Sequence, residues 1–307
     1  ICCVEDSDAS DINSLLDRAN MALKTIKVKG AAQWKFYDHT MRDKLLREKD
    51  LEIRMEKALA DGEFLVYIQP KYWVGTRALA GGEALVRWKS PDQGFLSPGE
   101  FIPLFEKNRF IVKLDQFMFT SVCGLLRQWL DAGIEPRPLS VNVSRMQFHT
   151  PDFVERYIRI KSQYAIPDGL LELEFTESIF FDNVALLSSA VHELRRAGIK
   201  CSIDDFGAGY SSLNVLKALP VSVLKLDGMF FRTAKDDEQA KIVIRNIMRM
   251  AGELKMATVA EGVETHEQVA FLETTGCDII QGYVFARPMP AAEFTELLAG
   301  EGGHAER

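Results

Sequence analysis

The sequence predicts an α/β fold, a (β/α)8 barrel of the TIM type modified by one antiparallel strand and preceded by a short α+β fragment. From Glu63 onward, eight apolar strand segments alternate with helical segments over about 250 residues, the length typical of such a barrel. The connection from Gly75 to Ala78 between the first two strands is short and polar, without room for a helix. Because so short a link joins antiparallel neighbours, we expect the first strand to run against the second.

The residues before the barrel are too few to build a core of their own. Residues 12–28 place apolar side chains at helical spacing, and Gly30 follows as a stop signal. Gln33 to Tyr37 is a short aromatic segment that predicts a strand, and a charged helix is expected from about Met41 through Leu59.

The barrel elements follow one another in a regular order. Strands are predicted at 64–70, 79–87, 138–143, 170–175, 199–204, 222–227, 256–261 and 278–282. Helices are predicted between them at 113–131, 151–164, 183–197, 237–254 and 265–274. Gly198, Pro220 and Gly276 mark returns from helix to strand.

Composition excludes several classes of protein. With 47% hydrophobic and 26% charged residues the chain is too apolar to be disordered, and no window approaches 18 consecutive apolar residues, so no membrane span is expected. A net charge of −7 argues against a binder of nucleic-acid polymers. The five cysteines are scattered without a CxxC pair, which indicates a reducing, cytoplasmic setting and no zinc site. The chain starts at Ile1 without a signal peptide, which suggests a piece of a longer protein.

Polar residues stand where the predicted strands end. Barrel active sites lie at the carboxyl ends of the strands, where doubly buried strands should otherwise be apolar. The second strand presents Glu83, Leu85 and Arg87 on one face. The polar strand-end residues of the other strands are Asn142, Glu174, Asp204, Asp205, Lys225, Asp227, Glu261 and Gln281.

Carboxylates gathered at one barrel mouth repel one another unless a cation lies between them. Oxygen ligands without His or Cys favour Mg²⁺ or Mn²⁺ over zinc. Asp204 and Asp205 can both reach metal if the chain leaves the strand between them, and Gly207 and Gly209 provide that exit. One bridging Asp with ligands on both sides is typical of two-metal sites that cleave phosphodiesters. Lys225 and Arg87 then become partners for phosphate.

Each residue taken singly also fits a structural role. Glu83 or Glu261 fits a salt-bridged strand end, Asn142 fits a loop entry, and the Asp-Asp pair before a glycine-rich segment fits a turn. Their joint occurrence at equivalent strand ends favours the metal site. None of the five His residues occupies a strand end, so a metal-bound water is the expected nucleophile.

These residues resemble the EAL-domain family of cyclic-di-GMP phosphodiesterases over about residues 50–298. The matching motifs, in the family's order, are Gln69-Pro70-Lys71, Glu83-Ala84-Leu85-Val86-Arg87-Trp88, Val141-Asn142-Val143-Ser144, Glu174-Phe175-Thr176-Glu177-Ser178, Asp204-Asp205-Phe206-Gly207-Ala208-Gly209, Leu224-Lys225-Leu226-Asp227, Ala260-Glu261-Gly262-Val263-Glu264 and Gln281-Gly282-Tyr283.

The resemblance implies roles for these positions. The implied ligands of a first metal are Glu83, Asn142, Glu174 and Asp204, and the implied surroundings of a second are Asp204, Asp205 and, through water, Glu261. The implied catalytic residues are Glu261 as general base, Lys225 on the water or the phosphate, and the metal-binding Asp205 and Glu83. The implied substrate contacts are Gln69, Leu85, Arg87, Asp227 and Gln281. An implied regulatory loop, anchored by Glu177, contains Phe206, Gly207 and Gly209.

The implied reaction is hydrolysis of cyclic di-GMP to linear pGpG, with Mg²⁺ or Mn²⁺ as cofactor, Ca²⁺ as inhibitor and a homodimer as the assembly. A receptor that binds the dinucleotide without cleaving it is one alternative, and degenerate members that lose the carboxylates would fit it. A barrel hydrolase for another phosphodiester is the second, because the strand-end residues alone indicate metal and phosphate but not guanine.

The N-terminal piece resembles the end of a GGDEF (diguanylate cyclase) domain, from Ser14 to Leu23 and at Phe36-Tyr37-Asp38. The cyclase signature is absent, so no synthesis is expected from this chain. The resemblance divides the chain into 1–45, a GGDEF remnant with the start of a linker helix, and 46–307, the EAL domain. It also implies upstream GGDEF and sensory domains. The alternative is an unrelated helix and strand.

Overall fold

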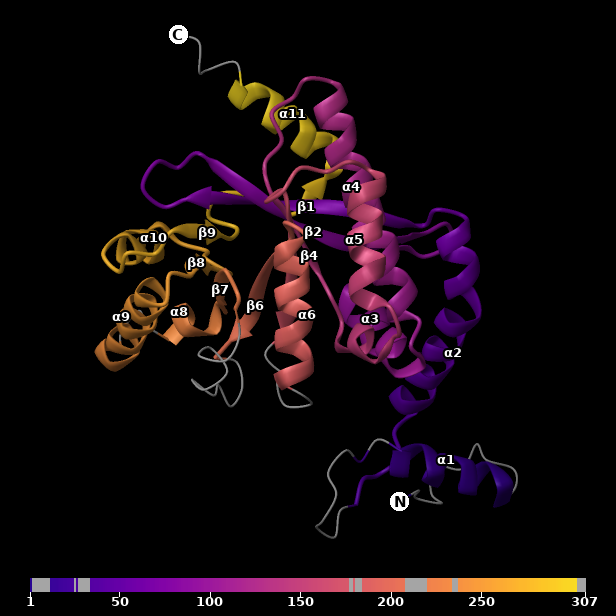
Figure 1. The fold of residues 1–307 in the computed structure, drawn as a ribbon. Helices are drawn as coiled ribbons and strands as arrows, with labels where there is room; N and C mark the ends of the chain where they lie inside the picture. The colour runs from indigo at the N-terminus through magenta and orange to yellow at the C-terminus, as the bar shows by residue number, and fades with distance from the viewer. Residues whose placement is uncertain are drawn as a thin grey trace.

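Ten strands in the described part of the chain form one sheet that closes on itself (Figure 1). The computed structural model describes residues 1, 12–24, 26, 34–176, 179, 184–207, 220–233 and 237–302. The strands are β1 (Phe64–Trp73), β2 (Leu79–Ser90), β3 (Gly94–Leu96), β4 (Leu139–Asn142), β5 (Leu171–Thr176), β6 (Lys200–Phe206), β7 (Val223–Leu226), β8 (Ala257–Ala260), β9 (Ile279–Gln281) and β10 (Met289–Pro290). All eight predicted strands are present.

The first strand closes the barrel in the antiparallel sense. β1 pairs with β2 on one side and with β9 on the other, and both pairings are antiparallel. The remaining barrel strands follow in the order β2-β4-β5-β6-β7-β8-β9, each parallel to the next. The predicted barrel with one antiparallel strand is therefore confirmed.

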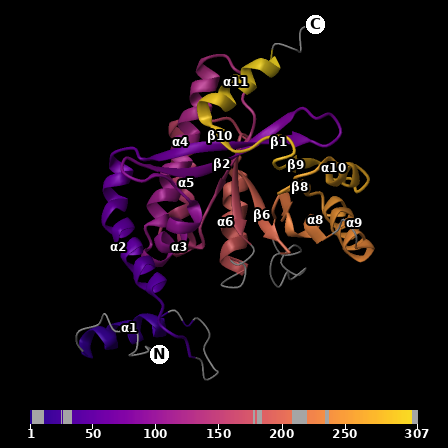
Figure 2. The same ribbon diagram turned by 180° about the vertical axis from the view of Figure 1, so that it is seen from behind.

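Helices surround the strands, with α3 to α5 toward α2 and α8 to α10 on the opposite side (Figures 1 and 2). The barrel helices are α3 (Pro98–Asn108), α4 (Ile111–Asp131), α5 (Phe153–Gln163), α6 (Val184–Arg196), α8 (Met229–Thr233), α9 (Glu238–Glu253), α10 (His266–Glu273) and α11 (Ala291–Gly302), with a 3-10 turn, η2 (Arg145–His149). Local capping fixes their starts. Ser97 and Glu100 form a capping box at α3, and Thr265 and Gln268 form another at α10.

The N-terminal fragment lies at the start of α2, apart from the barrel (Figures 1 and 2). It contains α1 (Ile12–Lys24), which leads on to α2 (His39–Ala60). The strand predicted from Gln33 to Tyr37 is wrong for residues 34–37, which form no strand, and Gln33 lies outside the described residues. A strand needs a hydrogen-bonded neighbour, and in the described part the backbone of Lys35 and Tyr37 meets only Ile1.

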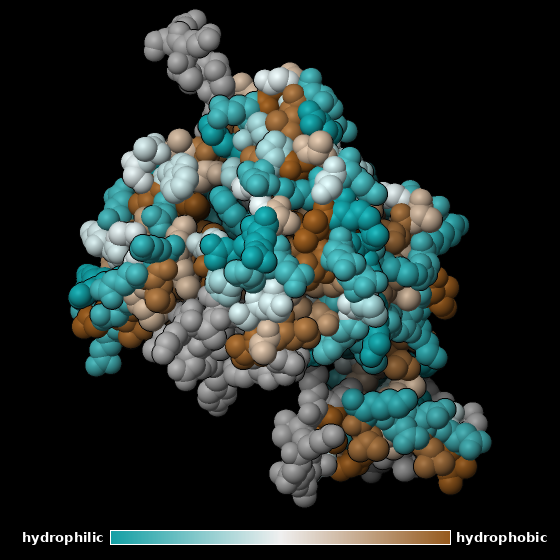
Figure 3. Space-filling view, viewed as in Figure 1, coloured by the Kyte–Doolittle hydropathy of each residue, from teal (hydrophilic) through white to brown (hydrophobic). Residues whose placement is uncertain are grey.

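The described residues of this fragment form almost no core, as its length predicts. Ala22 is the one buried residue of α1, whereas Leu16, Leu23 and Trp34 are more than half exposed. Figure 3 shows hydrophobic atoms at the surface of the fragment.

Side chains of the barrel strands alternate between two environments. In β5, Leu171, Leu173 and Phe175 belong to the main core between strands and helices. Glu172 and Glu174 therefore point the other way, into the barrel. A second core of Phe64, Trp88, Phe101, Phe105 and neighbouring residues joins α2 and α3 to the end of β2.

No helix among the described residues is long and apolar enough to cross a membrane. Cys123, Cys201 and Cys277 are buried thiols without a disulfide, and Cys2 and Cys3 lie outside the described residues.

Candidate active site and metal centre

The strand order brings the predicted residues together at the barrel mouth. Gln69 of β1 stands opposite Glu83 of β2, and Asn142 of β4 stands opposite Glu174 of β5. The other residues come from the ends of β6, β7 and β9 and from the residue after β8, and they are Asp204, Asp205, Lys225, Gln281 and Glu261. The structure thus gathers these predicted residues at one site.

The two adjacent aspartates both face this site because the strand is interrupted between them. β6 changes register between Ile203 and Phe206, and Asp205 has a left-handed φ of 53°. As a result, carboxylate oxygens of Asp204, Asp205 and Glu261 lie within 4.8 Å of one another. The chain thus leaves the regular strand at Asp205, as the sequence predicted. Gly207, with φ of 93°, comes directly after the end of β6.

Lys225 is the cationic centre of the site. Its Nζ lies 2.5 Å from Glu174 Oε2, 2.6 Å from Glu261 Oε1 and 3.1 Å from Asp204 Oδ1. Glu83 Oε2 is 3.7 Å away, and the lysine side chain is 1% exposed. One ammonium therefore offsets part of the charge of four carboxylates.

Glu174 lies between two lysines. Lys71 of β1 donates to Glu174 Oε1 at 2.9 Å and to Ser140 Oγ at 2.7 Å. The sequence motif contained Lys71, but no role was predicted for it. The signal was its position two residues after Gln69, which places both side chains on the same face of β1.

Two amide side chains fix Glu83. Asn142 Nδ2 donates to Glu83 Oε1 at 2.7 Å, and Gln281 Nε2 donates to Glu83 Oε2 at 2.6 Å. Gln281 also donates to Gln69 Oε1 at 3.2 Å. Because Asn142 donates through nitrogen, its carbonyl oxygen Oδ1 is the atom it can offer to a metal.

Burial and mutual repulsion shift the carboxylates from their ordinary behaviour. Burial raises the pKa of Glu83, Asp204 and Asp205, and it raises the pKa of Glu261 well above the usual range. Glu174 is the exception, because burial is outweighed by the charges of Lys225 and Lys71, which lower its pKa. A divalent cation would offset the repulsion that helps raise the pKa of these four carboxylates. Their oxygens and the amide oxygen of Asn142 therefore fit a hard ion such as Mg²⁺ or Mn²⁺.

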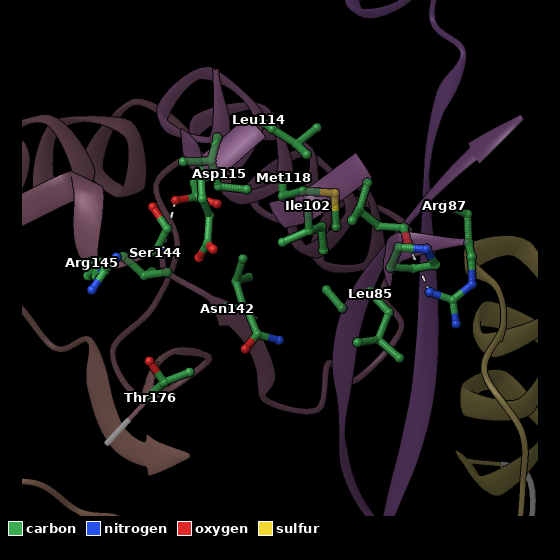
Figure 4. A pocket seen from close by; sticks show the side chains of 17 residues that line it. Leu85, Arg87, Ile102, Leu114, Asp115, Met118, Asn142, Ser144, Arg145 and Thr176 are labelled. Carbon is green, nitrogen blue, oxygen red and sulfur yellow. Dashed lines mark hydrogen bonds between the residues drawn. The ribbon is translucent and has the colours of Figure 1, made fainter. Parts of the chain in front are cut away.

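A cavity of about 390 Å³ is lined by Asn142, one of the metal-ligand candidates (Figure 4). Its apolar lining includes Leu85, Ile102, Leu114, Met118 and Val141, and its polar lining includes Arg87, Asp115, Asn142, Ser144, Arg145 and Thr176. Predicted substrate contacts Leu85 and Arg87 thus face the same space as Asn142. The volume and the largely apolar walls with a few polar groups are typical of a small-molecule site.

Asp115 is a buried acid in this cavity that the sequence did not predict. It accepts hydrogen bonds from the Ser144 N–H at 3.0 Å and from Gln147 Nε2 at 3.3 Å. Burial raises its pKa to about 7. Its position within an otherwise apolar face of α4 was the available signal.

The remaining predicted residues lie at the rim or outside the described part. Arg87 stacks on Tyr67 at 5.6 Å, with Nη1 donating to Val86 O. Asp227 accepts from the Met229 N–H at the start of α8, and its charge helps raise the pKa of Asp205. Of the predicted regulatory loop, Phe206 is buried at the end of β6, whereas Glu177 and Gly209 lie outside the described residues.

Known proteins share this sequence pattern and fold. The pattern of the EAL domain matches residues 53–288. The cyclic di-GMP phosphodiesterase NbdA of Pseudomonas aeruginosa is 34% identical over 292 residues, 95% of this chain and 37% of that protein. MucR of the same organism, a bifunctional diguanylate cyclase/cyclic di-GMP phosphodiesterase, is 32% identical over 292 residues, 95% of this chain and 43% of that protein. The chain spans less than half the length of these relatives.

The fold is also that of a solved relative. The PaMucR phosphodiesterase in its c-di-GMP complex superposes with a TM-score of 0.75 at 35% sequence identity. The match covers 80% of this chain and 99% of that one.

Proposed function

The chain belongs to the EAL-domain family, and we propose that it hydrolyses cyclic di-GMP to linear pGpG with Mg²⁺ or Mn²⁺ as cofactor. The observation that carries the proposal is the joint placement of five carboxylates and Lys225 at the carboxyl end of the barrel. Relatives named as cyclic di-GMP phosphodiesterases support the choice of substrate.

Two metal positions fit the donors. We assign Glu83, Asn142 Oδ1, Glu174 and Asp204 to the first, and Asp204, Asp205 and, through water, Glu261 to the second. Divalent ions held there supply positive charge to the phosphoryl oxygens and lower the pKa of water.

The protein's own groups move the proton and hold the phosphate. Glu261 accepts a proton from the attacking water, a role that suits a carboxyl whose pKa is raised by burial. Lys225, 2.6 Å from Glu261, donates to the water or to a phosphoryl oxygen. The water oxygen bonds to phosphorus as its proton passes to Glu261, and the P–O3′ bond breaks. The 3′ oxygen takes up a proton from solvent and Glu261 returns its own to solvent, which leaves pGpG.

The cavity beside Asn142 explains how a dinucleotide would be held. It accepts one base between the apolar residues of β2, α3 and α4, while Arg87 at its edge faces a phosphate. Gln281 holds Glu83 and also donates to Gln69, and we assign Gln69, Gln281 and Asp227 to the substrate side of the site.

Further properties follow by analogy with the family. We propose Ca²⁺ inhibition, a cytoplasmic location, a homodimer, a regulatory loop from Phe206 with Glu177 as its anchor, and upstream GGDEF and sensory domains of which residues 1–45 include a remnant. Residues 46–307 would then form the catalytic domain. A sedimentation profile that shows only monomer at micromolar concentration would count against the dimer.

A substrate panel tests the proposed function against its two rivals. The purified chain with Mg²⁺ is expected to cleave cyclic di-GMP and to leave cyclic di-AMP and bis(p-nitrophenyl) phosphate largely intact. Faster cleavage of another phosphodiester would identify a different barrel hydrolase. Tight binding of cyclic di-GMP without product at any divalent metal would identify a receptor.

A further inference from the structure

Lys71 is a buried lysine whose environment differs from that of Lys225. Its side chain points into the barrel from the antiparallel strand β1, and the residue is 6% exposed. Its Nζ contacts Glu174 Oε1 and Ser140 Oγ, at 2.9 Å and 2.7 Å. Ser140 stands two residues before Asn142 on β4, so Lys71 lies below the level of the metal-ligand candidates.

The two lysines divide the two oxygens of Glu174. Oε2 lies 2.5 Å from Lys225, which also contacts Asp204 and Glu261, so this oxygen faces the carboxylate cluster. Oε1 faces Lys71 and the barrel interior. Only one oxygen of this wholly buried carboxylate is therefore directed at the place where a metal would bind.

That division bears on the choice of metal. Mg²⁺ requires near-octahedral geometry with few protein ligands, whereas Ca²⁺ takes six to eight oxygens and readily binds both oxygens of one carboxylate. Because the ammonium of Lys71 keeps Oε1 turned toward the barrel interior, away from the other carboxylates, Glu174 presents one oxygen to a metal at the mouth.

We propose that Lys71 is a positioning residue that restricts Glu174 to a single ligand oxygen and thereby makes the centre prefer Mg²⁺ or Mn²⁺ over Ca²⁺. The inference rests on the metal centre of the proposed function. Ser140 contributes by accepting a hydrogen bond from the ammonium at 2.7 Å.

Metal binding measured without turnover tests the role of Lys71. Free Mn²⁺ is quantified by electron paramagnetic resonance while Mg²⁺ or Ca²⁺ competes for the protein, and the ratio of the two competition constants reports the preference. Lys71→Met keeps an unbranched side chain shorter by one atom and removes the charge. We expect its preference to move toward Ca²⁺ by about tenfold, the effect of losing a residue that orients a metal ligand.

Two further variants separate positioning from general destabilisation. Lys161→Met is the matched control, because Lys161 is also a buried lysine in an ion pair but contacts Asp168 and Ala197 instead of the site. Its ratio should stay that of the wild type. Ser140→Ala leaves Lys71 charged but loosens it, and a smaller shift toward Ca²⁺ is expected; this variant decides the question if Lys71→Met does not fold.

The outcomes separate this inference from the proposed function. An unchanged Ca²⁺/Mg²⁺ ratio in Lys71→Met, or in Ser140→Ala when it alone folds, overturns the role of Lys71 while the metal centre stands. Absence of Mn²⁺ binding to the wild type overturns the metal centre and this inference together.

Discussion

Replacing Lys225 by methionine should destabilise the metal-free protein and make its stability depend more strongly on metal. The substitution removes an ammonium that is 1% exposed and lies within 4 Å of Glu174, Glu261, Asp204 and Glu83. The closest pair, at 2.5 Å, has a gross attraction of about 7 kcal/mol at an effective dielectric constant of 20, before desolvation is counted. Removing one partner from such a buried pair costs about 3–5 kcal/mol net.

The variant should therefore melt well below the wild type when EDTA is present. A loss of about 3–5 kcal/mol corresponds to a fall in melting temperature of about 6–20 °C for a domain of this size. Saturating Mn²⁺ should reduce the difference, because divalent charge replaces the lost ammonium and a ligand that binds the native state more tightly stabilises it more. The difference should also become smaller as pH falls, since protonation of Glu83 and Glu261, whose pKa values are raised by burial, relieves the repulsion.

Circular dichroism melts in EDTA and in Mn²⁺ measure both effects. Lys113→Met is the control, because Lys113 forms an exposed ion pair with Glu56 whose loss should cost about 1 kcal/mol or less. If Lys225→Met melts with the wild type in EDTA, or if Mn²⁺ stabilises both proteins equally, Lys225 is not the charge that offsets this cluster.

Three other perturbations test separate parts of the structure. Glu83→Ala should abolish turnover of cyclic di-GMP by removing a metal ligand; near-normal hydrolysis by the folded variant would refute the assigned site. Gly282→Ala should destabilise the fold by about 3 kcal/mol, the upper end of the usual cost of overpacking, because the new Cβ would overlap the backbone of Val263; a urea midpoint equal to that of the wild type would contradict this. Asp115→Asn should flatten the pH dependence of stability: the native pKa of about 7 lies above the unfolded value, so the wild type loses up to about 4 kcal/mol as pH rises from about 4 to 7. If the unfolding free energies of the wild type and of Asp115→Asn change with pH in the same way across that range, Asp115 titrates normally.

The site could be predicted from the sequence because barrel geometry converts strand position into spatial position. Glu174 and Asp204 interrupt apolar strands at their carboxyl ends, and parallel register places Glu174 opposite Ser202, two residues before Asp204, so that both side chains reach the same mouth of the barrel. The interruption of β6 at Asp205 was also accessible, because two adjacent acids can share a site only where the alternation of the strand is broken.

Features that depend on tertiary contacts could not be predicted from the sequence in the same way. A lysine in a strand ordinarily indicates solvent, so nothing local to Lys71 reveals that it pairs with Glu174 across the barrel. No helix was predicted at α3, because Pro98 and Pro103 ordinarily indicate the absence of a helix. In the structure Pro98 lies in the first turn of α3, and Pro103 lies within the helix. The segment predicted as a strand at 33–37 shows the opposite error, because aromatic composition favours a strand but cannot supply a partner.

The metal dependence of pGpG formation tests the central claim most directly. Purified protein is incubated with cyclic di-GMP in Mg²⁺, Mn²⁺, Ca²⁺ or EDTA, and the products are separated by chromatography. The carboxylate centre predicts pGpG with Mg²⁺ or Mn²⁺ and unchanged substrate with EDTA. Equal formation of pGpG in EDTA, after removal of bound metal is verified, would contradict it.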